Sequence, residues 1–240
     1  MIHNGSNQTQ FISRSSLPKA AQRWLDRALP ESLDLPTSIR LEQQGSMDIR
    51  GRWTSFKATG EYKSNPLSFN WRARLRLSPG VWITAEDGHN MGQGWGGARL
   101  WGIIPMGKRT DPEVLFSQVV RNLGELPWLP SFALINPDLE WIDLSETSFE
   151  VRYAAGGKEA IVQFEINDQG DIVKAFSPAR PYDVPGGYAE APWYYEFSDH
   201  KEFRGMLIPA AAAATFDKSG TAWKYFQGRV TTLTFDAAAK

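Results

Sequence analysis

Apolar and polar residues alternate over most of this chain, and the alternation predicts β-strands. In the clearest run, residues 67–77, every second side chain is apolar and most of the intervening ones are arginine. Because successive side chains of a strand point to opposite faces, this run predicts a strand with one face on the core. The turn residues Pro79-Gly80 follow it, and residues 81–86 are its expected hairpin partner. Similar patterns predict about ten strands in all.

Two segments instead show the spacing of amphipathic helices. In residues 17–29 the apolar side chains share one helical face, with Ser16 as the expected N-cap and Pro30 after the last turn. A second helix is expected to begin after Asp111 and to end before Pro127. These elements predict an α+β fold, with one strongly curved, mostly antiparallel sheet wrapped around one or two helices.

The pattern predicts one domain, residues 17–240, preceded by a flexible N-terminal arm of residues 1–16. The arm is polar and lacks the apolar stretch of a secretory signal. No window approaches 18 uninterrupted apolar residues, so no membrane span is expected. We therefore predict a cytoplasmic protein.

Composition narrows the function classes further. The 240 residues carry 26 basic and 27 acidic side chains, which argues against a nucleic-acid partner. The chain has no Cys, so disulfides, thiol nucleophiles and thiolate metal sites are excluded. The oligomeric state stays open.

Ten Trp residues stand out against this average composition. Most are expected in the core, but eight lie on or beside predicted strands, which also fits an aromatic-lined ligand cavity. The glycine-rich residues 87–106 are predicted to form a bulged strand, a ligand-lining loop, or both. We expect Trp95, Trp101 and Trp128 to form the cavity wall.

A second irregular segment, residues 178–192, is rich in Pro, Gly and Tyr and is predicted to be a loop. Its tyrosines and those just after it are expected to form a rim or lid, with Tyr194 as a ligand-binding residue. The others of this set are Tyr182, Tyr188 and Tyr195.

Metal and phosphate chemistry find little support. The three His residues form no His-rich metal motif, and a set of His89, His200 and a carboxylate such as Asp87 is the weaker alternative to hydrogen-bonded histidines. The glycines at 92–97 do not open a helix as a dinucleotide-binding loop would. We expect no metal and no cofactor.

Proton transfer is a stronger candidate. Asp87 and His89 precede the glycine-rich segment, and Glu125 lies on the apolar-striped end of the second helix, where burial shifts pKa values. The structural alternative for Glu125 is a buried ion pair that holds the helix on the sheet, with arginines 72, 74 and 76 as partners. These arginines form either a solvated outer face or, on a concave face, an anion clamp in which Arg74 anchors the ligand.

Several motifs resemble an uncharacterised bacterial family, a domain of unknown function. They are the Leu17-Pro18 to Leu29-Pro30 helix, the Gly92-x-Gly94 to Pro105 segment, Glu125-Leu-Pro-Trp-Leu-Pro130 and Ala191-Pro192-Trp193. The strand pattern is also similar to the half-barrel of the lipoprotein carriers LolA and LolB and of the pigment enzyme VioE. That resemblance implies an apolar cavity between sheet and helix, filled by acyl chains in the carriers and by an aromatic intermediate in the enzyme.

Three hypotheses follow. The first is a protein that binds a small hydrophobic or aromatic molecule, as a cofactor-independent cyclase, isomerase or lyase that uses Glu125, His89 and Asp87. The second is a non-catalytic carrier of lipid or acyl chains. The third is a structural domain without a ligand, for which no pocket above about 300 Å³ is expected.

Overall fold

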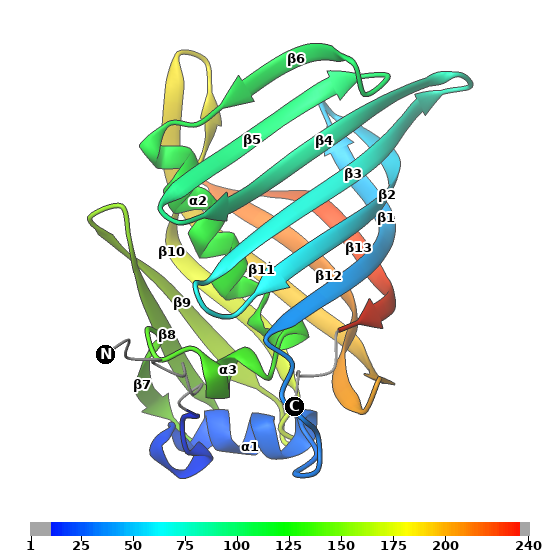
Figure 1. Ribbon diagram of the computed structural model, residues 1–240. Coiled ribbons are helices and arrows are strands. Elements are labelled where there is room, and N and C mark those ends of the chain that lie inside the picture. The colour runs from blue at the N-terminus through cyan, green and yellow to red at the C-terminus, as the bar shows by residue number, and fades with distance from the viewer. Residues whose placement is uncertain (1–10, 236–240) are drawn as a thin grey trace, which may run out of the picture.

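Thirteen antiparallel strands form one continuous sheet that curls around helix α2 (Figure 1). The computed structural model describes residues 11–235. The strand order is β6-β5-β4-β3-β2-β1-β13-β12-β11-β10-β9-β8-β7, so two meanders are joined where β1 pairs with β13. The strands are β1 Ser38–Ile49, β2 Arg52–Lys63, β3 Ser68–Ser78, β4 Val81–Asn90, β5 Gln93–Leu100, β6 Ile104–Arg109, β7 Glu140–Ser145, β8 Ser148–Ala155, β9 Lys158–Ile166, β10 Ile172–Val184, β11 Gly187–Phe203, β12 Met206–Lys218 and β13 Thr221–Thr234.

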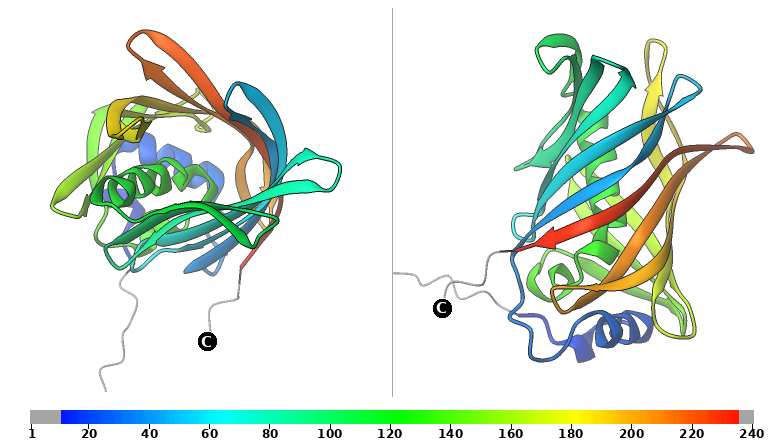
Figure 2. Two further views of the ribbon diagram at one scale, coloured as in Figure 1. Left: turned by 90° about the horizontal axis from the view of Figure 1, so that it is seen from above. Right: turned by 90° about the vertical axis from the view of Figure 1, so that its right-hand side faces the viewer.

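The helices occupy the inside and one end of this sheet. Seen from above, α2 lies within the ring of strands (Figure 2, left), where it packs against β4, β5, β8, β9 and β10. It belongs to the long connection between the two meanders, which also contains η2 and α3. The five helical elements are η1 Arg14–Ser16, α1 Lys19–Ala28, α2 Pro112–Gly124, η2 Leu126–Trp128 and α3 Phe132–Ile135.

The predicted α+β class and the curved antiparallel sheet are confirmed. In β3, Trp71, Ala73 and Leu75 are buried against the inside, while the three arginines between and after them are exposed on the outer face. The core continues from this meander through α2 and into the second meander. One sheet face and the helices inside it therefore share a single hydrophobic core.

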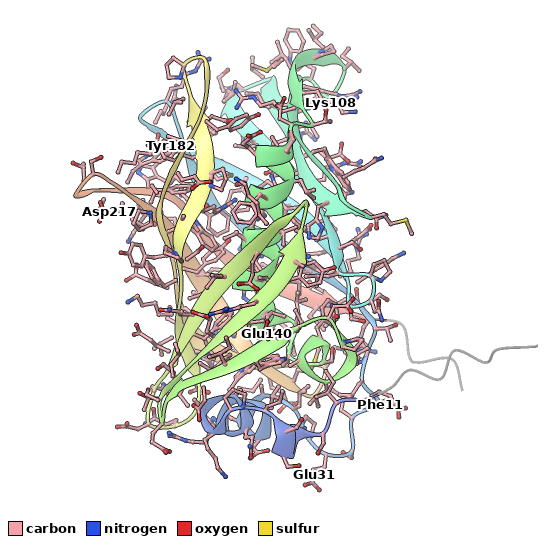
Figure 3. The ribbon with its side chains drawn as sticks, turned by 90° about the vertical axis from the view of Figure 1, so that its left-hand side faces the viewer. Phe11, Glu31, Lys108, Glu140, Tyr182 and Asp217 are labelled. Carbon is pink, nitrogen blue, oxygen red and sulfur yellow. The ribbon has the colours of Figure 1, made fainter. Side chains whose placement is uncertain are left out.

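Helix α1 covers the lower end of the ring, opposite the end at which Lys108 lies (Figure 3). Its buried face consists of Ala20, Ala21, Trp24, Leu25 and Ala28. Pro18, rather than the expected Ser16, is the N-cap. Residues 1–10 of the predicted arm lie outside the described residues, whereas residues 14–16 form η1 and the N–H of Ile12 donates to the carbonyl of Leu134.

The prediction of a loop at residues 178–192 is wrong. This segment is the hairpin of β10 and β11, with a turn at Pro185-Gly186. Pro178 and Pro192 are tolerated because a β-bulge between Ser177 and Arg180 interrupts the ladder where they lie. The estimate of about ten strands was also too low, since the structure has 13.

The glycine-rich segment is strand rather than loop, and its glycines permit close packing. A Cβ atom at Gly94 would lie 2.3 Å from the Cα of Leu115, so only glycine lets β5 lie directly against α2. On the opposite face, a Cβ at Gly88 would lie 2.6 Å from the ring of Trp95. Gly94 faces the helix and Gly88 accommodates an aromatic ring on the outer face.

Candidate functional site

A cavity of about 430 Å³ lies inside the ring, between α2 and the strands around it. We call it the inner cavity. Tyr182, which lines it, lies on the β10–β11 hairpin at the end of the molecule away from α1 (Figure 3). Its walls are largely aromatic and apolar, from Met106, Val114, Tyr182, Tyr188, Phe216, Trp223 and Tyr225.

Arg180 is the buried cation of this cavity. Only 7% of it is exposed, and its Nε donates to the carbonyl and the hydroxyl of Ser117, each at 3.2 Å. Its Nη1 donates to the hydroxyl of Tyr225 at 2.9 Å, and the guanidinium lies 4.6 Å from the ring centre of Trp193. Among residues 11–235 no carboxylate forms an ion pair with it. Asp87 of the same cavity acts on Arg180 only beyond ion-pair distance. A buried guanidinium without a directly contacting carboxylate can therefore bind a closer anion.

Further polar groups line the same cavity, among them the Arg109–Asp183 ion pair, Gln118 and Asp87. Gln118 of α2 is 7% exposed, and its Oε1 is buried without a hydrogen-bond partner in the described residues. The Asp87 side chain of β4 is 28% exposed. A Cβ at Gly96 would lie 3.2 Å from Asp87 Oδ1 and 3.9 Å from Gln118 Nε2, so glycine leaves space between these two side chains.

A buried ion-pair cluster, formed by Arg121, Glu125, Asp87, Tyr62 and Tyr195, adjoins the cavity at Asp87. Arg121 Nε donates to Glu125 Oε1 at 2.8 Å, and its Nη1 donates to Asp87 Oδ2 at 3.2 Å. The hydroxyls of Tyr62 and Tyr195 donate to Glu125 at 2.9 and 3.3 Å. Both carboxylate oxygens of Glu125 are therefore occupied, and its exposure is 1%.

Burial dominates the electrostatics of this cluster. It raises the pKa of Asp87 above its ordinary value, although the charges of Arg121 and Arg180 oppose the shift. Burial followed by the charge of Glu125 raises the pKa values of Tyr62 and Tyr195 well above the usual range. Burial is the largest single influence on Arg121 and would lower its pKa, but Glu125, Tyr195, Asp87 and Tyr62 together outweigh it and raise that pKa. The tyrosines thus stay neutral donors and Arg121 stays charged.

The ion pair of Glu125 differs from the expected one. Its partner is Arg121, one turn earlier on α2, because Arg72, Arg74 and Arg76 point away from the helix on the outer face. The guanidinium of Arg121 also lies over the rings of Phe69 and Trp71, at 5.1 and 4.8 Å from their centres. The cluster thereby connects α2 to β3, which is the structural role considered for Glu125.

His89 is buried beside this cluster but does not line the inner cavity. It is 2% exposed, and its Nε2 lies 2.9 Å from Asn122 Nδ2. Burial lowers its pKa to about 4. The ring is therefore neutral at pH 7, and Nε2 accepts from the Asn122 amide. Of the three residues predicted to transfer protons, Asp87 lines the inner cavity, while Glu125 and His89 lie in the protein interior.

The residues predicted for the cavity wall do not line the inner cavity; Trp95 lines a separate hollow of about 410 Å³. Trp95 packs on Gly88 at the outer face. Trp101 is 41% exposed in the turn before β6, and its indole N–H donates to the carbonyl of Gly80. Trp128 is 1% exposed in the core and donates to Pro209 O. Tyr194 lies on the outer face against Phe176. Tyr182 and Tyr188 do line the inner cavity, as expected of a rim.

Arg180, Gln118 and Trp223 line the inner cavity but were not among the residues predicted for it. The inward orientation of Arg180 was not predictable, because the bulge between Ser177 and Arg180 breaks the alternation that shows which side chains face inward. Gln118 could have been identified from the sequence, because it is a polar residue within the apolar stripe of α2. The structure shows that it is buried.

Within residues 11–235, no group of three or more His, Asp or Glu side chains is placed to hold a metal ion. The longest helix there, α2, has 13 residues, and no described helix has the length and hydrophobicity needed to cross a membrane.

Solved structures with related folds were found at low sequence identity. A LolA superfamily protein from Nitrosomonas europaea is 10% identical, with 94% of each chain covered and a TM-score of 0.46. A putative outer membrane lipoprotein-sorting protein domain from Vibrio parahaemolyticus is 8% identical, with 95% of each chain covered and a TM-score of 0.48. A DUF1329 family protein from Desulfovibrio piger is 11% identical, covering 92% of this chain and 93% of its own, with a TM-score of 0.47.

No curated protein matches the sequence significantly. Residues 9–228 match a family of unknown function, DUF6544. This match spans the entry helix, the glycine-rich segment and the Glu125–Pro130 motif, and it confirms the resemblance to an uncharacterised family. The chain belongs to the DUF6544 family of unknown function.

Proposed function

We propose that this protein binds a small, largely aromatic or apolar molecule with one anionic group in the inner cavity. The observation that carries the proposal is Arg180, a buried guanidinium that lines the cavity and has no acidic partner among residues 11–235. A carboxylate or similar anion from a ligand supplies the missing partner. Charge-assisted hydrogen bonds to arginine are among the strongest available for recognition.

The cavity walls support the apolar part of the ligand. Trp223, Phe216, Tyr182 and Tyr225 present aromatic surface, and ligand sites typically combine such walls with a few convergent polar groups. The volume of about 430 Å³ lies at the lower end of the ordinary range of about 300–1,000 Å³. It suits a compact ring system better than a triacylated lipid.

Polar groups at the cavity give the ligand an orientation. Arg180 projects from β10, and Gln118 and Asp87 project from α2 and β4. The buried Oε1 of Gln118 lacks a donor, so a hydroxyl or N–H group on the ligand would satisfy it. This arrangement favours specific binding over the featureless apolar cavity expected of an acyl-chain carrier.

Isothermal titration calorimetry of the full chain with matched probes tests the proposal. 1-Naphthoate is expected to bind at least tenfold more tightly than 1-naphthylmethanol, which has the same ring but no charge. Arg180→Gln should abolish that difference, and Trp223→Leu should weaken binding of both probes. Trp53→Leu is the control, because Trp53 is 44% exposed and lies outside the inner cavity.

Equal affinity for the two probes, or an undiminished preference for naphthoate in Arg180→Gln, would contradict the proposal. Far-ultraviolet circular dichroism of each variant establishes that it is folded. For a folded variant, a loss of probe affinity is then assigned to the change in the inner cavity.

A further inference from the structure

A second hollow, of about 1130 Å³, lies on the outer face of the sheet, separate from the inner cavity. We call it the outer groove. Three of its four cationic residues, Lys57, Arg74 and Arg76, are exposed and alternate along β2 and β3 with side chains that face the core. The fourth, Arg229 of β13, is paired with Asp199. An adjoining hollow of about 500 Å³ shares Lys57 and Arg74 with it. The groove extends from the β3–β4 turn at Gly80 to β11 at Ser198.

The charges in this groove differ from those elsewhere on the same face. Several cross-strand partners of opposite sign form ion pairs, as do Arg40 with Glu61, Arg72 with Glu86, and Lys174 with Glu165. In the groove, Lys57 and Arg74 are direct cross-strand partners and carry the same sign. Like charges placed opposite each other in a sheet are destabilising.

No acidic side chain of residues 11–235 forms an ion pair with Lys57, Arg74 or Arg76. The guanidinium of Arg74 is held 4.1 Å from the ring centre of Trp82, which leaves its outward edge free to donate. Arg76 is the cross-strand partner of Trp82. Three cations thus gather at one end of the groove. The acidic residue of the lining, Glu196, lies beside Ala213 at the other end and forms no ion pair with them among residues 11–235.

The other end of the groove offers apolar surface instead. Ala211 and Ala213 of β12 are half-buried and face outward, where longer polar side chains would be usual. They are flanked by Ser198 and Glu196 on β11 and by Arg229 and Gln227 on β13. The groove therefore has a cationic end at β2–β3 and, at β12, a short aliphatic strip between polar side chains.

We propose that the outer groove binds a single-chain anionic amphiphile. The carboxylate or phosphate head lies at Lys57, Arg74 and Arg76, and the chain extends over Ala211 and Ala213. The site is independent of the inner cavity, since the two linings share no residue. The head group neutralises the like-charged Lys57–Arg74 pair, and the chain covers aliphatic surface that is otherwise in contact with water.

Calorimetric titrations below the critical micelle concentration test this site in the full chain. Dodecanoate and dodecyl phosphate are both expected to bind, and the tighter of the two identifies the head group. Dodecyltrimethylammonium, which has the same chain and the opposite charge, and acetate, which lacks the chain, should bind at least tenfold more weakly.

The variant Lys57→Gln/Arg74→Gln/Arg76→Gln should lose at least tenfold in affinity for the anionic amphiphiles. Arg40→Gln, at an exposed ion-paired position on the same face outside the groove, is the matched control and should leave the affinity unchanged. Ala213→Glu should weaken dodecanoate binding, since it places a carboxylate in the path of the chain.

Arg180→Gln separates the two sites, because it should leave binding at the outer groove intact. If the triple variant binds dodecanoate as the wild type does, or if the ammonium amphiphile binds equally well, the outer-groove proposal is overturned. Loss of dodecanoate binding in Arg180→Gln alone would assign the amphiphile to the inner cavity and also overturn it. Failure of naphthoate binding leaves this proposal untouched.

Discussion

At the scale of single residues, Arg121 connects the carboxylates of Glu125 and Asp87 inside the protein. Its side chain is 10% exposed and that of Glu125 is 1% exposed, so both groups have lost most of their hydration. The interaction between them replaces that hydration, together with two tyrosine hydroxyls. Either group alone would be a buried charge without a counter-charge, so the stability of each depends on the presence of the other.

Removing one member of this pair should therefore cost more than removing both. Arg121→Met is expected to destabilise the protein by about 3–5 kcal/mol, because Glu125 is left buried without a counter-charge. The double variant Arg121→Met/Glu125→Leu should recover a large part of that loss. Urea unfolding of the wild type, both single variants and the double variant measures the coupling. Additive losses would contradict the interpretation of the cluster as one unit.

His89 makes stability depend on pH. Its pKa is about 4 in the folded protein, against about 6.5 in an unfolded chain. Between these values the unfolded state binds more protons than the folded state. The contribution of His89 to the free energy of unfolding is therefore present in full above pH 6.5 and is lost as the pH falls towards 4. The contribution amounts to about 3 kcal/mol.

His89→Gln should flatten this acid-side loss, measured as the free energy of unfolding at pH 7, 5.5 and 4.5. His200→Gln is the comparison variant. The pKa of His200 is also lowered, mainly by burial, but the residue is only half-buried, so its substitution should flatten the profile less. An unchanged pH profile in His89→Gln would show that the neutral, buried His89 does not control it.

At the scale of elements, glycines determine how closely α2 approaches the sheet. Gly94 lies against the backbone of Leu115, and Gly124 lies against the ring of Trp193, where a Cβ would be 2.6 Å from it. Together they let one helix pack between the two halves of the ring. The position of α2 in turn places Gln118 at the inner cavity and Arg121 at the ion-pair cluster.

Gly94→Ala should consequently destabilise the protein by about 1–3 kcal/mol, since the added methyl group overlaps the backbone of α2. Gly187→Ala is the matched control, because no atom lies within 4 Å of a Cβ at that position and its backbone is not left-handed. Thermal unfolding of the two variants compares them, and a loss in the control as large as that in Gly94→Ala would rule out the packing explanation.

At the scale of the whole molecule, the β1–β13 pairing joins the two meanders into one sheet. The strands approach closely at this seam, where a Cβ at Gly45 would lie 2.1 Å from the carbonyl oxygen of Gln227. The same hydrophobic core includes residues of both meanders and of α1 and α2. The packing of each meander therefore depends on the other meander and on α1 and α2.

This continuity predicts cooperative unfolding. Tryptophan fluorescence and far-ultraviolet circular dichroism should report the same urea midpoint, and Gly45→Ala at the seam should lower both midpoints equally. Two separated transitions, or a shift in one signal alone, would indicate that the meanders unfold independently.

Much of the fold was predictable because it rests on local pattern. The period of two in β3, the apolar stripe of α2 and the Pro79-Gly80 turn each identify an element without reference to the rest of the chain. The β10–β11 hairpin was not predictable in this way, since Pro178 and the bulge beside it remove the alternation.

The alternation of side chains was enough to predict the class of fold and the burial of one face of the sheet, and the apolar stripe of α2 pointed to a buried Glu125. Which side chains meet depends on the packing of distant elements. Periodicity assigns a residue to a face, but the curl of the sheet decides whether that face lines a cavity, packs in the core or lies outside. That is why Trp95, expected on the cavity wall, lies outside the ring, while Arg180, hidden behind a bulge, lines the inner cavity.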